Sequence, residues 1–189
     1  MILALLGDLA APIILSIPLF LLWGLVVFLQ NRKKKKRTNI LRYIFTCFFL
    51  VSLVAILLQT VSFNFDAYGL HYWGSVNLVP FHEISRMVDN TMNGYAVRYF
   101  FENMVGNILL FIPFGLFLPV TFPKIKHWWL MIVFGFSLSI LIESAQLFMP
   151  GRSTDVDDVI LNTFGCMIGV LLYLGCRRIF PKLIARIRA

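Results

Sequence analysis

The stretches WWLMIVFGFSLSILIESAQLF (128–148) and VDDVILNTFGCMIGVLLYLGC (156–176), joined through PGRSTD (150–155), decide the fold. Each long stretch has 21 residues and is almost wholly apolar. About 20 apolar residues in a helix cross the hydrocarbon core of a bilayer. The sequence therefore predicts two membrane-spanning helices connected by a short acidic turn.

The composition of the whole chain agrees with a membrane protein. Hydrophobic residues make up 59% of the 189 residues, charged residues make up 14%, and the mean hydropathy is +0.83. A soluble domain has about 45–50% apolar residues, so a soluble core of this length could not bury the excess. A net charge of +8 would suit nucleic acid in a soluble chain, but here the basic residues form short blocks beside apolar runs and act as topology signals. We expect no nucleic-acid partner.

Three further apolar runs extend this pair, so we expect an all-α membrane bundle of about five transmembrane helices in one domain. The expected segments are a first span over 9–30, a basic loop over 31–42, a second span over 43–65, a loop with an interfacial helix over 66–98, a third span over 99–119, a fourth span over 128–148, an acidic turn over 150–158, a fifth span over 156–176 and a basic tail over 177–189.

The long loop over 66–98 carries an amphipathic pattern. Phe81, Ile84, Val88 and Met92 recur near helical spacing, and polar or charged residues fill the other faces. The pattern predicts a helix that lies in the membrane interface.

The charges predict the orientation of the bundle. Of the 17 basic residues, 14 fall in the segments 31–42, 120–127 and 177–189, and none of the nine acidic residues does. Because Lys and Arg accumulate in cytoplasmic loops, we expect these segments to face the cytoplasm. The amino terminus is then outside, the carboxyl terminus is cytoplasmic, and the acidic turn lies on the outer side.

Polar side chains gather at that outer end. Glu143 lies roughly 10 Å below the turn at Pro150, at about 1.5 Å per residue. A charge at such a depth costs at least about 2.5 kcal/mol, so Glu143 should face the bundle interior or a wet cavity. The residues expected to line this cavity and bind a ligand are Asn103, Asn107, Glu143, Gln146, Arg152, Asp155, Asp157, Asp158 and Asn162.

Each of these residues also has a purely structural interpretation. The structural roles are capping of the fifth helix by Ser153, Thr154 or Asp155, hydrogen bonding between helices by Asn103 and Asn107, and an ion pair between Glu143 and Arg152. Because lipid penalises each polar group separately, a shared cavity is favoured when the residues are taken together. The three histidines share no spacing, and we expect no metal and no cofactor.

Several ordered motifs resemble one family. The motifs are NLVPF (77–81), NMVGN (103–107), FIPFG (111–115), ESAQ (143–146), GRSTDVDD (151–158) and NTFG (162–165). Over about residues 40 to 175 the chain resembles the VanZ-like family. This resemblance implies a small protein of the bacterial cytoplasmic membrane, in a family named for a member associated with resistance to the glycopeptide teicoplanin. It singles out the same polar positions as the topology.

The sequence is consistent with three different functions. The first is binding of a lipid-linked envelope molecule, such as a cell-wall precursor, or of a lipoglycopeptide antibiotic in the outer cavity. The second is an enzyme that modifies such a lipid, with Glu143, Asp155 or Asp158 as general base. The third is a lipid transporter or flippase. Membrane lipids are expected partners in each case, and the sequence leaves the oligomeric state open.

Overall fold

Four of the five expected spans lie wholly or mostly in the part of the chain that the structure, a computed structural model, describes. The described residues are 18, 39–61, 75–92, 100–149 and 152–188. Apart from Pro18, the expected first span over 9–30 lies outside them, as does the basic loop up to residue 38. Residues 62–65 of the expected second span, 66–74 and 93–98 of the long loop, 99 of the third span and 150–151 of the acidic turn also lie outside them. The elements are α2 (Ile40–Val61), β1 (Val76–Asn77), α4 (His82–Met92), the π-helical turn η1 (Phe101–Val105), α6 (Gly106–Thr121), α7 (Trp128–Gln146), β2 (Thr154–Asp155), α8 (Val156–Ile179) and α9 (Pro181–Arg188).

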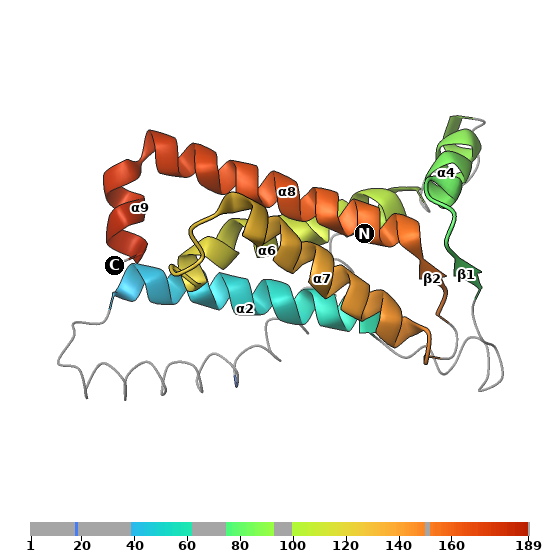
Figure 1. Cartoon of the computed structure of the whole chain (residues 1–189), viewed down its shortest axis with the longest axis horizontal. Helices are drawn as coiled ribbons and strands as arrows, with labels where there is room; N and C mark the ends of the chain where they lie inside the picture. Colours follow the sequence, from blue (N-terminus) through green and yellow to red (C-terminus); the bar gives the residue numbers. More distant parts are fainter. Residues whose placement is uncertain (1–17, 19–38, 62–74, 93–99, 150–151, 189) are drawn as a thin grey trace, which may run out of the picture.

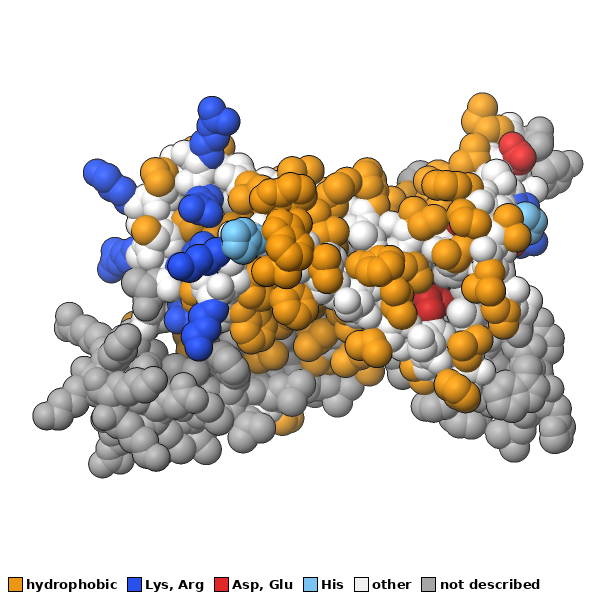
Figure 2. Space-filling view, in the orientation of Figure 1, with side chains coloured by type: hydrophobic (Ala, Val, Ile, Leu, Met, Phe, Trp, Pro, Cys, Tyr) orange, Lys and Arg blue, Asp and Glu red, His pale blue; other side chains and the backbone are white. Residues whose placement is uncertain are grey.

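The helices α2, α6, α7 and α8 run along the long axis of the molecule and pack on one another (Figure 1). Helices α2, α7 and α8, and α6 together with the end of η1 (Asn103–Thr121), are long and apolar enough to cross a membrane. Only 28 to 39% of each apolar window is buried inside the bundle, so most of the apolar surface faces outward. Figure 2 shows hydrophobic side chains over the middle of the molecule and basic side chains at one end. The expected all-α membrane bundle is confirmed.

The tightest packing joins α6 to α8, and glycines permit it. A methyl group on Gly165 would overlap the carbonyl oxygen of Ile108, and one on Gly169 would overlap that of Ile112. Two glycines four residues apart therefore let the helix backbones approach as a small-xxx-small pair does in membranes. On its other side α6 meets α2 through aromatic rings, with the centroids of Phe49 and Phe114 separated by 5.3 Å.

The start of the third span differs from a plain α-helix. Residues Phe101–Val105 form a π-helical turn, and the α-helix begins at Gly106. Single π-helical turns inside helices are often found at functional sites. Asn103 lies in this turn and Asn107 lies in the first turn of α6, so both amides are close to the same end of the bundle.

The basic tail contains a helix that the sequence prediction missed. Pro181 begins α9, a position that suits proline because its missing N–H is not needed there. Ile187 is buried and Ile184 packs against the core, so one face of α9 covers the end of the bundle (Figure 1). We call this end of the bundle the basic end. It is formed by residues 122–127, by the carboxyl end of α8 and by α9.

The amphipathic helix expected near residues 81–92 is present as α4. It stands at the opposite end from α9 (Figure 1). Phe81, Val88 and Met92 are exposed, and Met87 is buried. Beside α4, β1 pairs in parallel with β2, with Val76 opposite Thr154. This pairing connects the loop before α4 to the connection between α7 and α8. The position of α4 in the membrane interface stays a prediction.

Candidate functional site

The end of the bundle opposite α9 collects the carboxylates that the sequence singled out. It is formed by the carboxyl end of α7, residues 147–149 and 152–155 of the connection, the amino ends of α6 and α8, and α4, and we call it the acidic end. Glu143, in the last turn of α7, is 6% exposed. Its Oε2 accepts a 2.9 Å hydrogen bond from the backbone N–H of Asp155. The hydroxyl of Thr154 donates to the backbone carbonyl of Glu143 at 3.3 Å. Glu143 therefore holds the connection against the end of α7.

Asp155 caps α8. Its Oδ1 accepts a 2.8 Å hydrogen bond from the N–H of Asp157, and it also accepts one of 3.0 Å from the side chain of Asn77. Capping of an otherwise unpaired helix N–H by Asp is a common N-cap arrangement. The structural role that the sequence offered for Asp155 is therefore present, and Asn77 attaches the loop before α4 to the same carboxylate.

Burial governs the protonation of Asp155. Removal from water raises the pKa of this carboxyl above its ordinary value, and the nearby charge of Asp157 raises it as well. The hydrogen bonds from the Asp157 N–H and from Asn77 oppose the shift. Burial is the largest of these causes, so the neutral form of Asp155 is favoured relative to an exposed carboxyl.

Asp157 binds α4. It is 1% exposed, and its two carboxylate oxygens accept hydrogen bonds of 2.5 Å from the N–H of Phe81 and 3.0 Å from the N–H of Ile84. A carboxylate at the start of a helix also suits the positive end of the helix dipole. Phe81 has a φ of 64°, a left-handed conformation that a bulky residue seldom adopts. Asp157 thus holds the start of α4 in a conformation that is unfavourable alone.

Asp158 faces α6. Its Oδ1 accepts a 2.7 Å hydrogen bond from the side-chain amide of Asn107. Deeper in the bundle, Asn162 is 1% exposed and donates to the hydroxyl of Ser139 at 2.9 Å. The side-chain oxygen of Asn162 is buried and has no hydrogen-bond partner in the described structure. Amides of α6 and α8 therefore form interhelical hydrogen bonds, the structural role considered for Asn107.

Arg152 lies between these carboxylates and α2. Its Nη2 donates a 2.6 Å hydrogen bond to the backbone carbonyl of Gln59. Burial lowers the pKa of Arg152, while the charges of Asp158 and Glu143 oppose the shift. The ion pair with Glu143 that the sequence offered as a structural alternative is not among the ion pairs of the described residues, and Oε2 of Glu143 accepts from the Asp155 backbone. The positive charge of Arg152 interacts electrostatically with the carboxylates of Asp158 and Glu143.

The structure brings most of the predicted site residues to the acidic end. Glu143, Arg152, Asp155, Asp157, Asp158 and Asn107 are joined there by the contacts above, Gln146 is buried one turn after Glu143, and Asn162 lies one turn after Asp158. Asn77 was missed, although it lies in the NLVPF motif. The cavity that would make these residues a binding site stays a prediction. The described residues contain no group of three or more His, Cys, Asp or Glu that could hold a metal ion.

Comparison with known proteins decides the family. The model of the VanZ/LLP1 family matches residues 45–180. The chain belongs to this family. VanZ/LLP1 membership covers α2 through α8, so it includes every element of the acidic end. Protein VanZ of Enterococcus faecium is 33% identical over 125 residues, which are 66% of this chain and 68% of that protein. No solved structure matches the chain.

Proposed function

We propose that this VanZ/LLP1 protein contributes to resistance to glycopeptide antibiotics of the teicoplanin type, or to cell-envelope homeostasis, by binding a lipid-linked or lipophilic ligand at the acidic end. One observation carries the proposal. Glu143 of α7 and Asp158 of α8 are fixed by protein donors beside Arg152 at one end of a bundle with an apolar exterior. The positive-inside pattern supports an outer position for that end.

The chemistry of this end suits a polar head group on an apolar molecule. Among the described residues, Glu143 uses Oε2 and Asp158 uses Oδ1 for the hydrogen bonds given above. The second oxygen of each carboxylate is then a candidate acceptor for the hydroxyl or ammonium groups of a ligand, and Arg152 is a candidate donor to phosphate or carboxylate. The exposed apolar surfaces of the helices would accommodate a lipid tail beside the head group.

Antibiotic sensitivity tests the proposal. The protein is expressed in a susceptible Gram-positive host, and the inhibitory concentrations of teicoplanin and vancomycin are measured. We expect the inhibitory concentration of teicoplanin to rise. Glu143→Gln and Asp158→Asn keep the size of each side chain and one acceptor oxygen, and each should abolish the rise at unchanged membrane abundance. Asp89→Asn is the matched control, because Asp89 is an exposed acid on α4.

Two results would count against the proposal. Unchanged sensitivity to both antibiotics would remove the resistance role, and loss of membrane abundance in both site variants would assign Glu143 and Asp158 to packing. The enzymatic alternative is tested with purified protein and a lipid-linked cell-wall precursor. A change in the precursor's mass that Glu143→Gln abolishes would replace binding by catalysis.

A further inference from the structure

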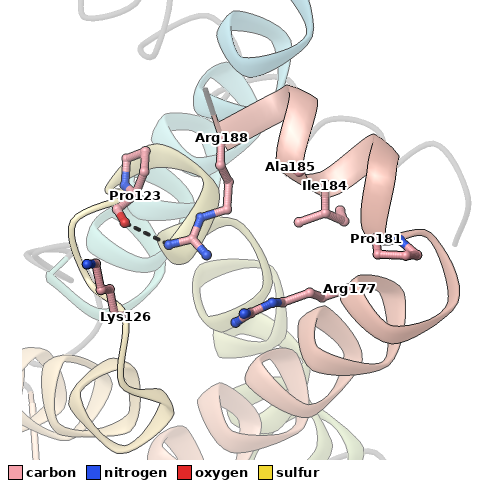
Figure 3. Close-up of a pocket in the computed structure, with 7 residues that line it drawn as sticks. All are labelled: Pro123, Lys126, Arg177, Pro181, Ile184, Ala185 and Arg188. Carbon is pink, nitrogen blue, oxygen red and sulfur yellow. Dashed lines mark hydrogen bonds between the residues drawn. The ribbon is translucent and has the colours of Figure 1, made fainter.

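The basic end contains a cavity of about 640 Å³, between the α6–α7 connection and the carboxyl ends of α8 and α9. Its lining includes the cationic side chains of Lys126, Arg177 and Arg188 and no acidic side chain (Figure 3). None of the described Asp and Glu residues forms an ion pair with these three side chains. The volume lies within the range of about 300–1,000 Å³ that is usual for small-molecule sites.

Arg188 is held rigidly at this cavity by neutral acceptors. Its Nη1 donates to the hydroxyl of Tyr173 at 2.8 Å, and its Nη2 donates to the carbonyl oxygens of Pro123 at 2.7 Å and Ile125 at 3.2 Å. Its Nε is buried and has no hydrogen-bond partner in the part of the chain that is described. These contacts fix the guanidinium, and they place no counter-ion from the described Asp and Glu residues on it.

The other two cations approach the same space from different elements. In Figure 3 the guanidinium of Arg177, at the end of α8, points toward that of Arg188, and Lys126 lies across the cavity on the α6–α7 connection. Both side chains are exposed. Three positive charges that converge here, with no carboxylate among the described lining residues, favour a ligand with a phosphate group, which accepts charge-assisted hydrogen bonds strongly.

An apolar cavity follows the cationic one along the bundle. It has a volume of about 200 Å³ and lies between α7 and α8, with Trp128, Leu171 and Leu174 in its lining. Leu174 precedes Arg177 by three residues, about 4.5 Å along a helix, and Trp128 follows Lys126 by two residues. The linings of the two cavities therefore come close together along the bundle, with cations toward the end and apolar side chains toward the middle.

We propose that the basic end binds an anionic phospholipid, with its phosphate in the cationic cavity and part of an acyl chain in the apolar one. Basic pockets between transmembrane helices are known to bind anionic head groups. The exposed rings of Trp128 and Trp129 at this level are of the kind that anchors helices at the membrane interface. A soluble phosphate compound would use the cationic cavity alone, so the adjoining apolar cavity favours lipid.

Native mass spectrometry of the full-length protein in detergent tests this site. Dioleoyl-phosphatidylglycerol is titrated against the wild type, against Lys126→Gln/Arg177→Gln and against Lys124→Gln/Arg178→Gln. The two double variants lose equal charge from neighbouring positions, but Lys124 and Arg178 do not line the cavity. We expect the affinity to fall at least about tenfold in the first double variant and to change less than about twofold in the second. Equal losses in both would overturn the proposal.

Further binding measurements distinguish a lipid phosphate from a soluble one, and a single variant replaces the double variant if the latter does not fold. Inorganic phosphate that binds as tightly as the lipid would replace the lipid by a soluble ligand, and dihexanoyl-phosphatidylglycerol that binds as tightly as the dioleoyl form would remove the acyl site. Should the first double variant not fold, Lys126→Gln alone, on an exposed connection, is compared with Lys124→Gln. We expect about fivefold weaker lipid binding for Lys126→Gln, and equal binding would refute the site. None of these results depends on ligand binding at the acidic end.

Discussion

The side-chain amide of Asn107 on α6 donates a 2.7 Å hydrogen bond to the carboxylate of Asp158 on α8. These two helices also share the most extensive contact in the bundle. One polar contact therefore joins the proposed site to the packing of the fold, and substitutions there should affect both.

Asn107→Leu should destabilise the fold. It removes a donor from a partly buried carboxylate, and loss of a hydrogen bond to a charged group typically costs about 1–3 kcal/mol. We expect a lower temperature of half-unfolding than in the wild type. Circular dichroism of the protein in detergent measures it. If the lost hydrogen bond is the cause, Asn107→Leu should cost less in an Asp158→Ala background, which lacks the acceptor oxygen. Equal costs in the two backgrounds would show that the packing of Leu causes the loss.

Asp157→Ala should loosen α4 without unfolding the bundle. Loss of a helix cap typically costs about 1 kcal/mol, and here the cap also holds Phe81 in a left-handed conformation. Hydrogen exchange measured by mass spectrometry should show faster exchange in peptides covering 82–92 and unchanged exchange in the middle of α8. Asp89→Ala, at an exposed position of α4, serves as the control. Unchanged exchange in α4 would disprove the capping role.

Gly169→Ala should lower the temperature of half-unfolding, whereas Gly175→Ala should leave it unchanged or raise it. A methyl group at Gly169 meets the backbone of α6, but at Gly175 it meets nothing within 4 Å. Both substitutions gain about 1 kcal/mol of helix propensity, so their difference measures the overlap. Equal shifts for the two variants would mean that α6 and α8 do not need the close approach.

Asp155→Asn should change how stability depends on pH. Because the pKa of Asp155 is raised in the folded state, its contribution to stability is fully present below its unfolded pKa, at about 3.9. That contribution is lost as pH rises through the folded pKa. The temperature of half-unfolding of wild type relative to Asp155→Asn should therefore fall as pH increases from about 4. Parallel pH profiles for the two proteins would contradict the raised pKa.

Cysteine labelling tests the orientation. In a variant whose native cysteines are replaced by serine, Ser153→Cys should react with a membrane-impermeant maleimide in intact cells, and Lys182→Cys should react only after lysis. Both positions are exposed, so access to the reagent depends on the side of the membrane. The reverse pattern would place the acidic end in the cytoplasm and remove the proposed encounter with external antibiotic.

The described spans were predictable because each is a continuous apolar run with its own signal. The α7 and α8 boundaries agree with the sequence at their amino ends, where Trp128 and the acidic turn mark the start. The amphipathic α4 was predictable from its spacing. In contrast, α9 was predicted as a tail because eight residues with three basic side chains and a leading proline look like a charged terminus. The packing of its one apolar face against α8 and α2 becomes visible only in the fold.

The candidate site was predictable as a set of residues but not as a network of contacts. Deep carboxylates and amides are visible in an apolar sequence because they are rare and costly there. Their partners are distant in the chain, as when Asp157 binds backbone amides more than 70 residues away at Phe81 and Ile84. The two-residue pairing of β1 with β2 is too short to leave a periodic pattern. Long-range partners of this kind require the fold.

The bond between Asp157 and the first turn of α4 makes the surface helix and α8 a mechanical unit. The exposed apolar face of α4 and the carboxylate of Asp158 are then separated by one side chain and one peptide link. We therefore expect a displacement of α4 to be transmitted to the first turn of α8, so that the position of α4 and the geometry of the acidic end change together.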